Sequence, residues 1–331
     1  MWLVHLTCGG KSRRQPVFSF QGNRFLRTRI YIDGYNLYYG CLKGTSFKWL
    51  DLLALFERQI VPSANAVVNG QRLTSEILPV AIKFFSAKIL AKAAKADDSM
   101  ACQERYHAAL RKHHPGRVEL IEGYYAMSAS RARVINQQYP KKWPRDCETI
   151  DVWKLEEKQS DVNLALHAFH DTLTGEVQHA IIVTNDTDIE PALKMIRQHT
   201  GAVLGLVIPT TDCQRIPNTS LEKRAHWVRK YITAAELAAS QLPRVIQGSK
   251  NPTVKPDSWY AQPALLRQSI ALGIVELGSR AKVFQWLERP LPMFANMTPL
   301  EMLETEVNGN KLILFMREWA ENLDAGRTKP D

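Results

Sequence analysis

Short apolar runs alternate with amphipathic, helix-like segments from residue 28 to residue 209, and this alternation limits the possible folds more than any other feature. Parallel strands need long crossover connections, which are usually helices, so the alternation predicts an α/β fold with a mostly parallel central sheet covered on both faces. The predicted strands are 28–33, 78–89, 117–125, 179–186 and 202–209. The predicted helices are 49–60, 102–114, 161–173 and 190–201.

The pattern changes near the C-terminal end, where a segment rich in Pro, Ser, Gly and Asn precedes periodic apolar residues typical of helices. The sequence therefore predicts a small helical domain behind a linker. At the other end, the first 29 residues hold six Lys/Arg and no acidic residue, which suits a basic extension, a disordered leader or an over-long start. The predicted divisions are a basic extension at 1–27, an α/β domain at 28–245, a linker at 246–263 and a helical domain at 264–331.

Composition excludes several classes of protein. The five cysteines are scattered and never spaced as CxxC, which argues against a disulfide framework and a zinc knuckle and favours a reducing cytoplasm. No apolar run approaches the roughly 20 residues that span a bilayer, so we expect no membrane role. The formal net charge of +10 favours polyanionic partners such as nucleic acid.

Acidic residues follow two of the predicted strands, and another begins a predicted helix. Asp33 ends the first strand, Asp186 and Asp188 follow a later one, and Asp161 stands at a helix start. Ligands of parallel sheets bind outside the carboxyl ends of the strands, where these carboxylates can converge. Taken singly, Asp161 is equally explained as a helix cap, and the other three as turn residues.

Taken together, these four carboxylates predict a site for a divalent cation. Hard oxygen ligands suit Mg²⁺ or Mn²⁺, and such an ion lowers the pKa of an attacking water and holds a phosphodiester oxygen. The predicted chemistry is metal-assisted phosphodiester hydrolysis.

Three motifs in this order resemble the NYN domains of the PIN-like ribonuclease superfamily, in the LabA-like bacterial branch: YIDGYNLYYG (31–40), KQSDVNLALHAFHD (158–171) and IIVTNDTDIEPALKMIRQHTGAVLGLVIP (181–209). The resemblance covers about residues 28–245 and implies a three-layer α/β/α fold and an endoribonuclease. It implies that Asp33, Asp161, Asp186 and Asp188 are catalytic metal ligands. It further implies supporting roles for Asn36, Lys158, Thr184 and Asn185.

A basic segment interleaved with aromatic residues lies between two predicted strands, at 128–145. Cations follow phosphates and rings stack on bases, so this segment predicts a contact with single-stranded RNA; a solvated surface loop anchored by its tryptophan is the alternative. Tyr35, Tyr38 and Tyr39 suit either RNA contact or apolar packing under the first loop. The histidines on helix 102–114 are expected at ordinary surface positions and not as metal ligands. The predicted RNA-binding residues are Arg131, Arg133, Lys141, Lys142, Trp143 and Arg145.

The C-terminal segment 279–326 resembles the toxin-binding domain of ParS/Xre-type antitoxins. Thr298 before Pro299 has the form of a helix N-cap, and Gly309 is expected to end that helix. The resemblance implies a toxin-like protein partner or self-association through Trp286, Thr298, Pro299 and Gly309.

The leading hypothesis from the sequence is a cytoplasmic, Mg²⁺- or Mn²⁺-dependent ribonuclease that belongs to a toxin-antitoxin or defence system. The alternatives are a catalytically weak RNA-binding regulator and an adaptor that binds a toxin. An intact set of four carboxylates favours the enzyme over either alternative.

Overall fold

A seven-stranded sheet forms the centre of the molecule. The computed structural model describes residues 25–64, 67–68, 71–72, 74–94, 96–211, 215–248 and 251–327. The strand order is β6-β5-β4-β1-β7-β8-β9, and every neighbouring pair is parallel except β5 with β6. The predicted α/β class with a mostly parallel sheet is therefore confirmed, whereas the finer PIN-like description stays a prediction. The strands are β1 (Phe25–Asp33), β4 (Thr74–Lys88), β5 (Val118–Arg133), β6 (Thr149–Lys158), β7 (His179–Val183), β8 (Val203–Val207) and β9 (Trp227–Arg229).

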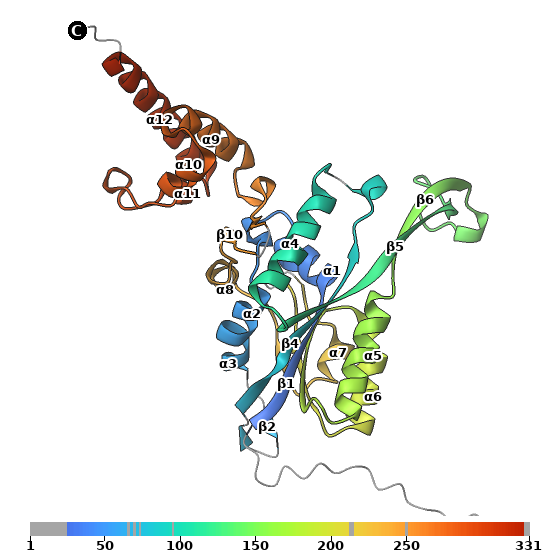
Figure 1. Ribbon diagram of the computed structural model, residues 1–331. Coiled ribbons are helices and arrows are strands. Elements are labelled where there is room, and N and C mark those ends of the chain that lie inside the picture. The colour runs from blue at the N-terminus through green and yellow to red at the C-terminus, as the bar shows by residue number, and fades with distance from the viewer. Residues whose placement is uncertain are drawn as a thin grey trace, which may run out of the picture.

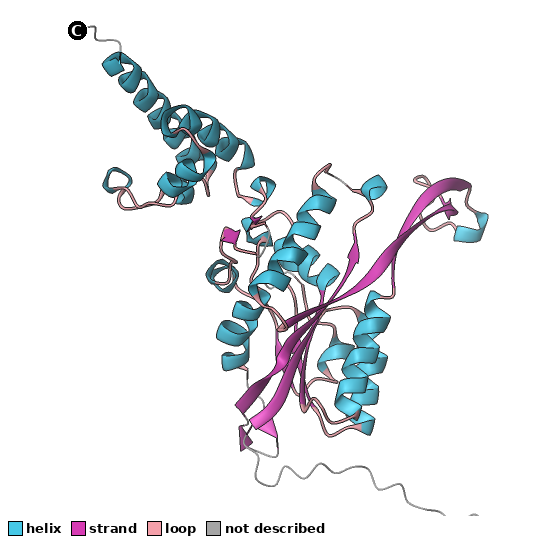
Figure 2. Ribbon diagram, in the orientation of Figure 1, coloured by secondary structure: helices cyan, strands magenta, loops and turns pink. Residues whose placement is uncertain are grey.

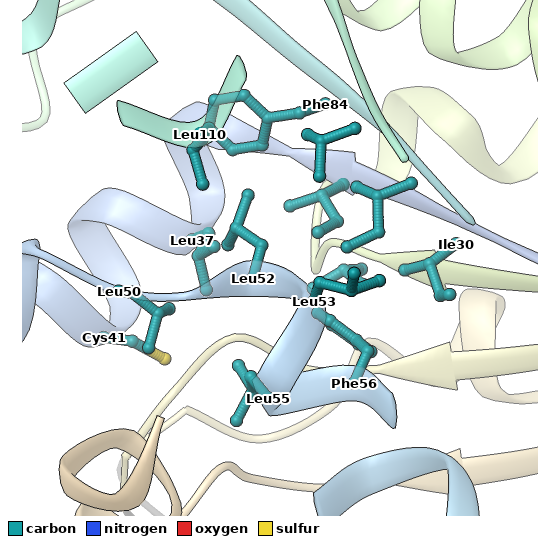
Figure 3. Close-up of a cluster of buried hydrophobic side chains, with 14 of the residues drawn as sticks. Ile30, Leu37, Cys41, Leu50, Leu52, Leu53, Leu55, Phe56, Phe84 and Leu110 are labelled. Carbon is teal, nitrogen blue, oxygen red and sulfur yellow. The ribbon is translucent and has the colours of Figure 1, made fainter. Parts of the chain in front are cut away.

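Helices cover both faces of this sheet (Figure 1). Along β1, Ile30 and Ile32 face one core while Tyr31 faces the other, as the two-residue period of a strand requires. The first core packs against α2 and α4, and Figure 3 shows Leu52, Phe56 and Phe84 within it. The helices of this part are α1 (Gly34–Leu37), α2 (Leu52–Ala54), α3 (Val61–Ser63), α4 (Ser99–His113), α5 (Ser160–Leu173), α6 (Glu190–His199), α7 (Thr219–Glu222) and α8 (Ala234–Ala239).

Two segments differ from the sequence-based expectation. The segment after β1 is not a loop, because α1 continues into a π-helical turn at Tyr38–Leu42. The predicted basic loop is largely a hairpin arm, since β5 continues to Arg133 and pairs antiparallel with β6. Figure 2 shows this arm projecting beyond the rest of the sheet. Two small antiparallel pairs complete the strands: β2 (Val67–Val68) with β3 (Gln71–Arg72), and β10 (Val245–Ile246) with β11 (Thr253–Val254).

The C-terminal helices have a hydrophobic core of their own, formed by residues such as Leu266, Phe284 and Met316. Gly309 does not end a helix: it lies inside α12, where an added Cβ would stand 2.6 Å from a methyl carbon of Leu265. The absence of a side chain at Gly309 therefore allows α12 to pack closely against Leu265. The helices are α9 (Pro263–Leu277), α10 (Arg280–Leu287), α11 (Pro299–Met302) and α12 (Glu306–Arg327).

Two further predictions concern the basic N-terminal extension and the membrane. Residues 1–24, most of the predicted basic extension, lie outside the described residues, and β1 already begins at Phe25. Among the described helices, none is both long and apolar enough to cross a membrane.

Candidate functional site

Asp33 and Thr184 lie side by side at the carboxyl edge of the sheet, because β1 and β7 are adjacent and parallel. The Thr184 hydroxyl donates to the Asp33 carboxylate over 2.8 Å. Asn36 donates to the same carboxylate through its backbone N–H at 2.9 Å and its side-chain amide at 2.6 Å. Burial raises the pKa of Asp33, while these hydrogen bonds oppose the rise. Asp33 is thus a buried carboxylate held in a fixed orientation.

A chain of hydrogen bonds extends from Asp33 to Asp186 and Asp188, which follow β7. The backbone N–H of Asp186 donates to the Thr184 hydroxyl at 3.1 Å, and the backbone N–H of Asp188 donates to the Asp186 carboxylate at 3.0 Å. Asp186 thereby caps the short helical turn Thr187–Ile189. The turn explanation for Asp186 therefore holds locally, and the same turn places it beside Asp33.

Asp161 completes the acidic cluster from the first turn of α5. Removal from water, followed by repulsion from Asp33 and Asp186, raises the pKa of Asp161 to about 6. Its side chain nevertheless remains exposed at the rim. A carboxylate with this pKa, open to a ligand, is suited to take a proton near neutral pH. The structure thus brings together the four predicted carboxylates with Asn36 and Thr184.

The other two predicted supporting residues point elsewhere. Lys158 pairs with Glu156 at 2.9 Å on β6. Asn185 joins the loop after β8, since its amide donates to the Ile216 carbonyl at 3.3 Å and accepts from the Asn218 N–H at 3.0 Å. Asn185 therefore holds the loop at Ile216–Asn218 next to the acidic cluster, whereas Lys158 belongs to the β5–β6 hairpin.

Three tyrosines from α1 and the following turn border the acidic cluster, and Tyr35, Tyr38 and Tyr39 are 47%, 38% and 39% exposed, so packing accounts for only part of each side chain. The rings of Tyr35 and Tyr39 lie 4.4 Å apart, and Tyr38 meets Tyr39 edge-on at 5.2 Å. The Lys43 ammonium lies 4.7 Å from the centre of the Tyr39 ring. An aromatic and cationic surface thus adjoins the carboxylates.

The predicted RNA-binding residues all lie on the β5–β6 hairpin. Arg133 donates to the Cys147 carbonyl at 2.9 Å, and the Arg145 guanidinium lies 5.7 Å from the Trp143 ring. Trp143 is 69% exposed, so it does not anchor the loop as the alternative supposed. The hairpin gathers Arg131, Arg133, Lys141, Lys142, Trp143 and Arg145 as an exposed group.

The C-terminal residues have structural partners. Thr298 caps α11 in a reciprocal pair with Glu301, as predicted, and Pro299 is the first residue of that helix. Trp286 stacks on Trp319 with ring centres 5.7 Å apart. These contacts explain Trp286, Thr298 and Pro299 by packing and capping.

Sequence reasoning missed a second buried carboxylate, Asp171 on α5. Its Oδ2 atom accepts from Arg29 and Lys83 at 2.8 Å each and from the Tyr31 hydroxyl at 2.7 Å. Burial alone would raise the pKa of Asp171, but these hydrogen bonds outweigh burial and lower it to about 2. Arg29 and Lys83 inside apolar strands were the available signal, since buried charges require partners.

Comparison with known proteins gives a close relative. The chain is 53% identical over 296 residues to 6-hydroxy-3-succinoylpyridine 3-monooxygenase HspA of Pseudomonas putida (strain DSM 28022 / S16), an alignment that covers 89% of this chain and 95% of the relative. No family model matches the chain. The crystal structure of a protein of unknown function, VPA0982 from Vibrio parahaemolyticus RIMD 2210633, aligns with 67% of this chain and 99% of its own length, with a TM-score of 0.34 and 15% identity.

This relative overturns the functional predictions made from the sequence. A monooxygenase is an oxidoreductase, so the NYN-type endoribonuclease, its hydrolase chemistry and the toxin-antitoxin assignment with its ParS/Xre resemblance are wrong. The predicted Mg²⁺ or Mn²⁺ cofactor is wrong too, because it was inferred for phosphodiester hydrolysis and the relative is named as a monooxygenase. The motifs misled because carboxylates at the carboxyl edge of a parallel sheet suit several chemistries. The predicted partners, which are RNA, a toxin-like protein and a second copy of the chain, are not tested by these comparisons and stay predictions.

Only about a tenth of this chain lies outside the alignment with the relative. The chain belongs to the family of 6-hydroxy-3-succinoylpyridine 3-monooxygenase HspA.

Proposed function

We propose that the protein is a monooxygenase that acts on a hydroxypyridine carrying an acidic acyl side chain. The observation that carries this proposal is the 53% identity, which spans 95% of the monooxygenase relative. The relative's name specifies a pyridine ring with a hydroxyl at carbon 6, a succinoyl group at carbon 3 and oxygenation at carbon 3. A monooxygenase inserts one atom of O₂ and reduces the other to water with two electrons from a reductant.

The carboxyl edge supplies the groups that such a substrate needs. We place the pyridine ring against the exposed Tyr35–Tyr39 pair, because offset aromatic contact suits a flat heterocycle. Asp161, whose pKa is about 6, is ionised at neutral pH and takes the proton of the 6-hydroxyl. Carbon 6 is para to carbon 3, so loss of this proton raises electron density at carbon 3. Because carbon 3 carries the succinoyl group, the new bond to one atom of O₂ replaces the bond from carbon 3 to the acyl carbon. The acyl group then leaves to water as succinate, and the ring product keeps the new hydroxyl.

The carboxylate of the succinoyl group requires a cation away from the acidic cluster. The Lys43 ammonium lies over the Tyr39 ring, and the Arg215 guanidinium lies beside Gly40, 3.6 Å from where a Cβ would stand. Both cations are on the side of the tyrosines. We assign them to the substrate carboxylate, which keeps that charge apart from Asp33 and Asp186.

The acidic cluster at the carboxyl edge of the sheet does not fit the phosphate of a flavin. A phosphate commonly binds at helix N-termini, where free N–H groups and the helix dipole favour an anion. Here Asp33 caps α1, Asp186 caps the turn at Thr187–Ile189, and Asp161 lies in the first turn of α5. Asp33 and Asp186 accept hydrogen bonds from backbone N–H groups that a phosphate would need, and the negative charges of all three carboxylates repel a phosphate. The proposed steps at this edge therefore concern only the substrate and the residues of this chain.

Oxygen uptake by the purified full-length protein tests this proposal. The assay contains 6-hydroxy-3-succinoylpyridine, reduced nicotinamide nucleotide and added flavin, and 3-succinoylpyridine, which lacks the 6-hydroxyl, is the matched control substrate. We expect substrate-dependent uptake with the hydroxylated compound and at least a hundredfold less with the control. Equal rates would contradict the proton-transfer role, and absence of uptake with either compound would contradict the proposed activity.

We also propose the hairpin group as a contact for single-stranded RNA, supported by the exposure of its cations and of Trp143. Replacement of Arg131 and Arg133 by Ala is expected to lower the salt dependence of binding to labelled RNA, because fewer counterions are released. An unchanged salt slope in a fluorescence anisotropy titration would contradict this contact.

A further inference from the structure

Two histidines and a carboxylate meet on the α2–α4 face of the molecule. The Nε2 atom of His114 lies 2.7 Å from Oδ1 of Asp51, and Nε2 of His113 lies 3.7 Å from Oδ2 of the same residue. One ligand atom from each of the three residues fits within a span of 4.8 Å. Sequence reasoning expected these histidines at ordinary surface positions, but the His114 side chain is only 15% exposed and His113 33%.

Local backbone structure holds the three side chains in place. Asp51 caps α2, where its Oδ1 accepts from the Ala54 N–H at 3.0 Å, and its own N–H donates to the Ser240 carbonyl at 2.8 Å. On the other side, α4 ends at His113, and the chain then turns through Gly116 at φ +74°. Because the helix ends there, two consecutive residues direct their rings to one carboxylate, which a continuing helix would not permit.

The donor set matches a transition metal better than a hard cation. Imidazole nitrogens suit Zn²⁺ or Fe²⁺, whereas Mg²⁺ prefers oxygen ligands throughout. Ligand atoms about 2.0–2.2 Å from Zn²⁺ in tetrahedral geometry stand about 3.4 Å apart. Here Nε2 of His114 lies 2.7 Å from one oxygen of Asp51, Nε2 of His113 lies 3.7 Å from the other oxygen, and one ligand atom from each residue lies within 4.8 Å of the other two. Side-chain shifts on the order of 1 Å would bring one atom of each residue to the spacing of an occupied site, and the three protein ligands would leave a coordination position for water.

We propose that Asp51, His113 and His114 form a binding site for one divalent transition-metal ion of the Zn²⁺ or Fe²⁺ class. The site is distinct from the acidic cluster, because α4 runs back from the carboxyl edge and ends where β5 begins. The ion would join the start of α2 to the end of α4. This inference does not depend on the proposed monooxygenase activity.

Metal titration of the full-length protein, first stripped with a chelator, tests the site. The probes are Zn²⁺ in calorimetry and Co²⁺ in absorption spectroscopy, in which the visible bands report nitrogen and oxygen ligands. The test variants are His113→Ala and His114→Ala. The His113 side chain is partly exposed, so we expect His113→Ala to keep the fold intact. If His114→Ala unfolds, His113→Ala alone still tests the site.

Two matched variants separate this site from others. His199→Ala removes an exposed histidine at the end of α6, and Asp186→Asn alters the acidic cluster. We expect one ion per chain in the wild type and in both control variants, and at least tenfold weaker binding in each test variant. Retained affinity in a folded His113→Ala protein, lost affinity in Asp186→Asn, or absence of one-to-one binding in the wild type would overturn the proposal.

Discussion

Asp171 and Asp161 stand ten residues apart on the same helix, yet their surroundings give them opposite properties. Asp171 is 2% exposed and receives hydrogen bonds from Arg29, Lys83 and Tyr31, which lower its pKa to about 2. Asp161 lies at the rim, where burial and repulsion from Asp33, Asp186, Glu157 and Asp188 raise its pKa to about 6. The first carboxylate stabilises the fold, whereas the second carries an unfavourable charge that the fold tolerates. Such a contrast marks the carboxyl edge as the functional region.

Replacement of Asp171 by Asn is expected to give the largest effect. The change leaves Arg29 and Lys83 buried without their shared anion, so the free energy of unfolding should fall by about 3–5 kcal/mol. Urea denaturation measures this loss. The matched control is Asp151→Asn on β6, where the exposed partner of Arg131 is replaced, and a change within about 0.5 kcal/mol is expected. If the free energy of unfolding of Asp171→Asn fell by less than about 1 kcal/mol, Asp171 would not be the carboxylate that stabilises the fold.

Replacement of Asp161 by Asn should affect turnover and leave the fold intact. The amide cannot accept the substrate proton, so we expect kcat to fall by about a hundredfold at pH 7.5 while the far-UV spectrum is unchanged. The wild-type rate should also fall below a pH of about 6, as Asp161 becomes protonated. Steady-state kinetics across pH 5–9 check both results, with Glu156→Gln on β6 as the control. Full activity in Asp161→Asn would exclude Asp161 as the base.

The pH dependence of stability should separate the two carboxylates. The pKa of Asp171 is lower in the folded state than the unfolded value of about 3.9, so its contribution of roughly 2 kcal/mol is present above pH 4 and is lost as pH falls towards 2. The pKa of Asp161 is raised, so its unfavourable contribution is present above pH 6 and disappears as pH falls towards 4.

Denaturation of wild type, Asp161→Asn and Asp171→Asn at several pH values checks these signs. Asp161→Asn should be the more stable protein at pH 7 and should match wild type near pH 4, whereas Asp171→Asn should lose the acid-dependent fall below pH 4. An Asp161→Asn protein that is less stable than wild type at pH 7 would show that this carboxylate is not under repulsion.

The smallest expected effect is that of Thr184→Val, which keeps the shape of the side chain and removes its hydroxyl. Thr184 donates to Asp33 and accepts from the Asp186 N–H, so its loss should cost about 1 kcal/mol of stability and raise the pKa of Asp33 further. Urea denaturation and titration by NMR check the two results. Thr174→Val, at an exposed helix end, is the control. Equal stability of the two variants would show that the hydrogen-bond chain is not needed.

The sequence predicted the parallel sheet and the meeting of the carboxylates because both follow from the order of strands and helices. Asp33 and Asp186 follow strands that prove adjacent, which the alternation made plausible. The sequence did not predict the β5–β6 arm, since its strands are largely exposed and the apolar residues of β6, such as Ile150, Trp153 and Leu155, do not alternate regularly with polar residues. Nor did it predict the Asp171 contacts or the group of Asp51, His113 and His114, because both depend on residues brought together from separate elements. The chemistry was misassigned because the same carboxylate motifs do not specify one reaction.

Mass spectrometry with oxygen-18 gives a direct test of the proposed monooxygenase activity. The full-length protein would be incubated with 6-hydroxy-3-succinoylpyridine and reduced nicotinamide nucleotide, with added flavin, under ¹⁸O₂ in ordinary water. We expect a pyridine product that carries one ¹⁸O atom, formed by the wild type at least about a hundredfold faster than by Asp161→Asn. A product without ¹⁸O, a product whose new oxygen derives from water, or an unchanged substrate would contradict the assignment as a monooxygenase.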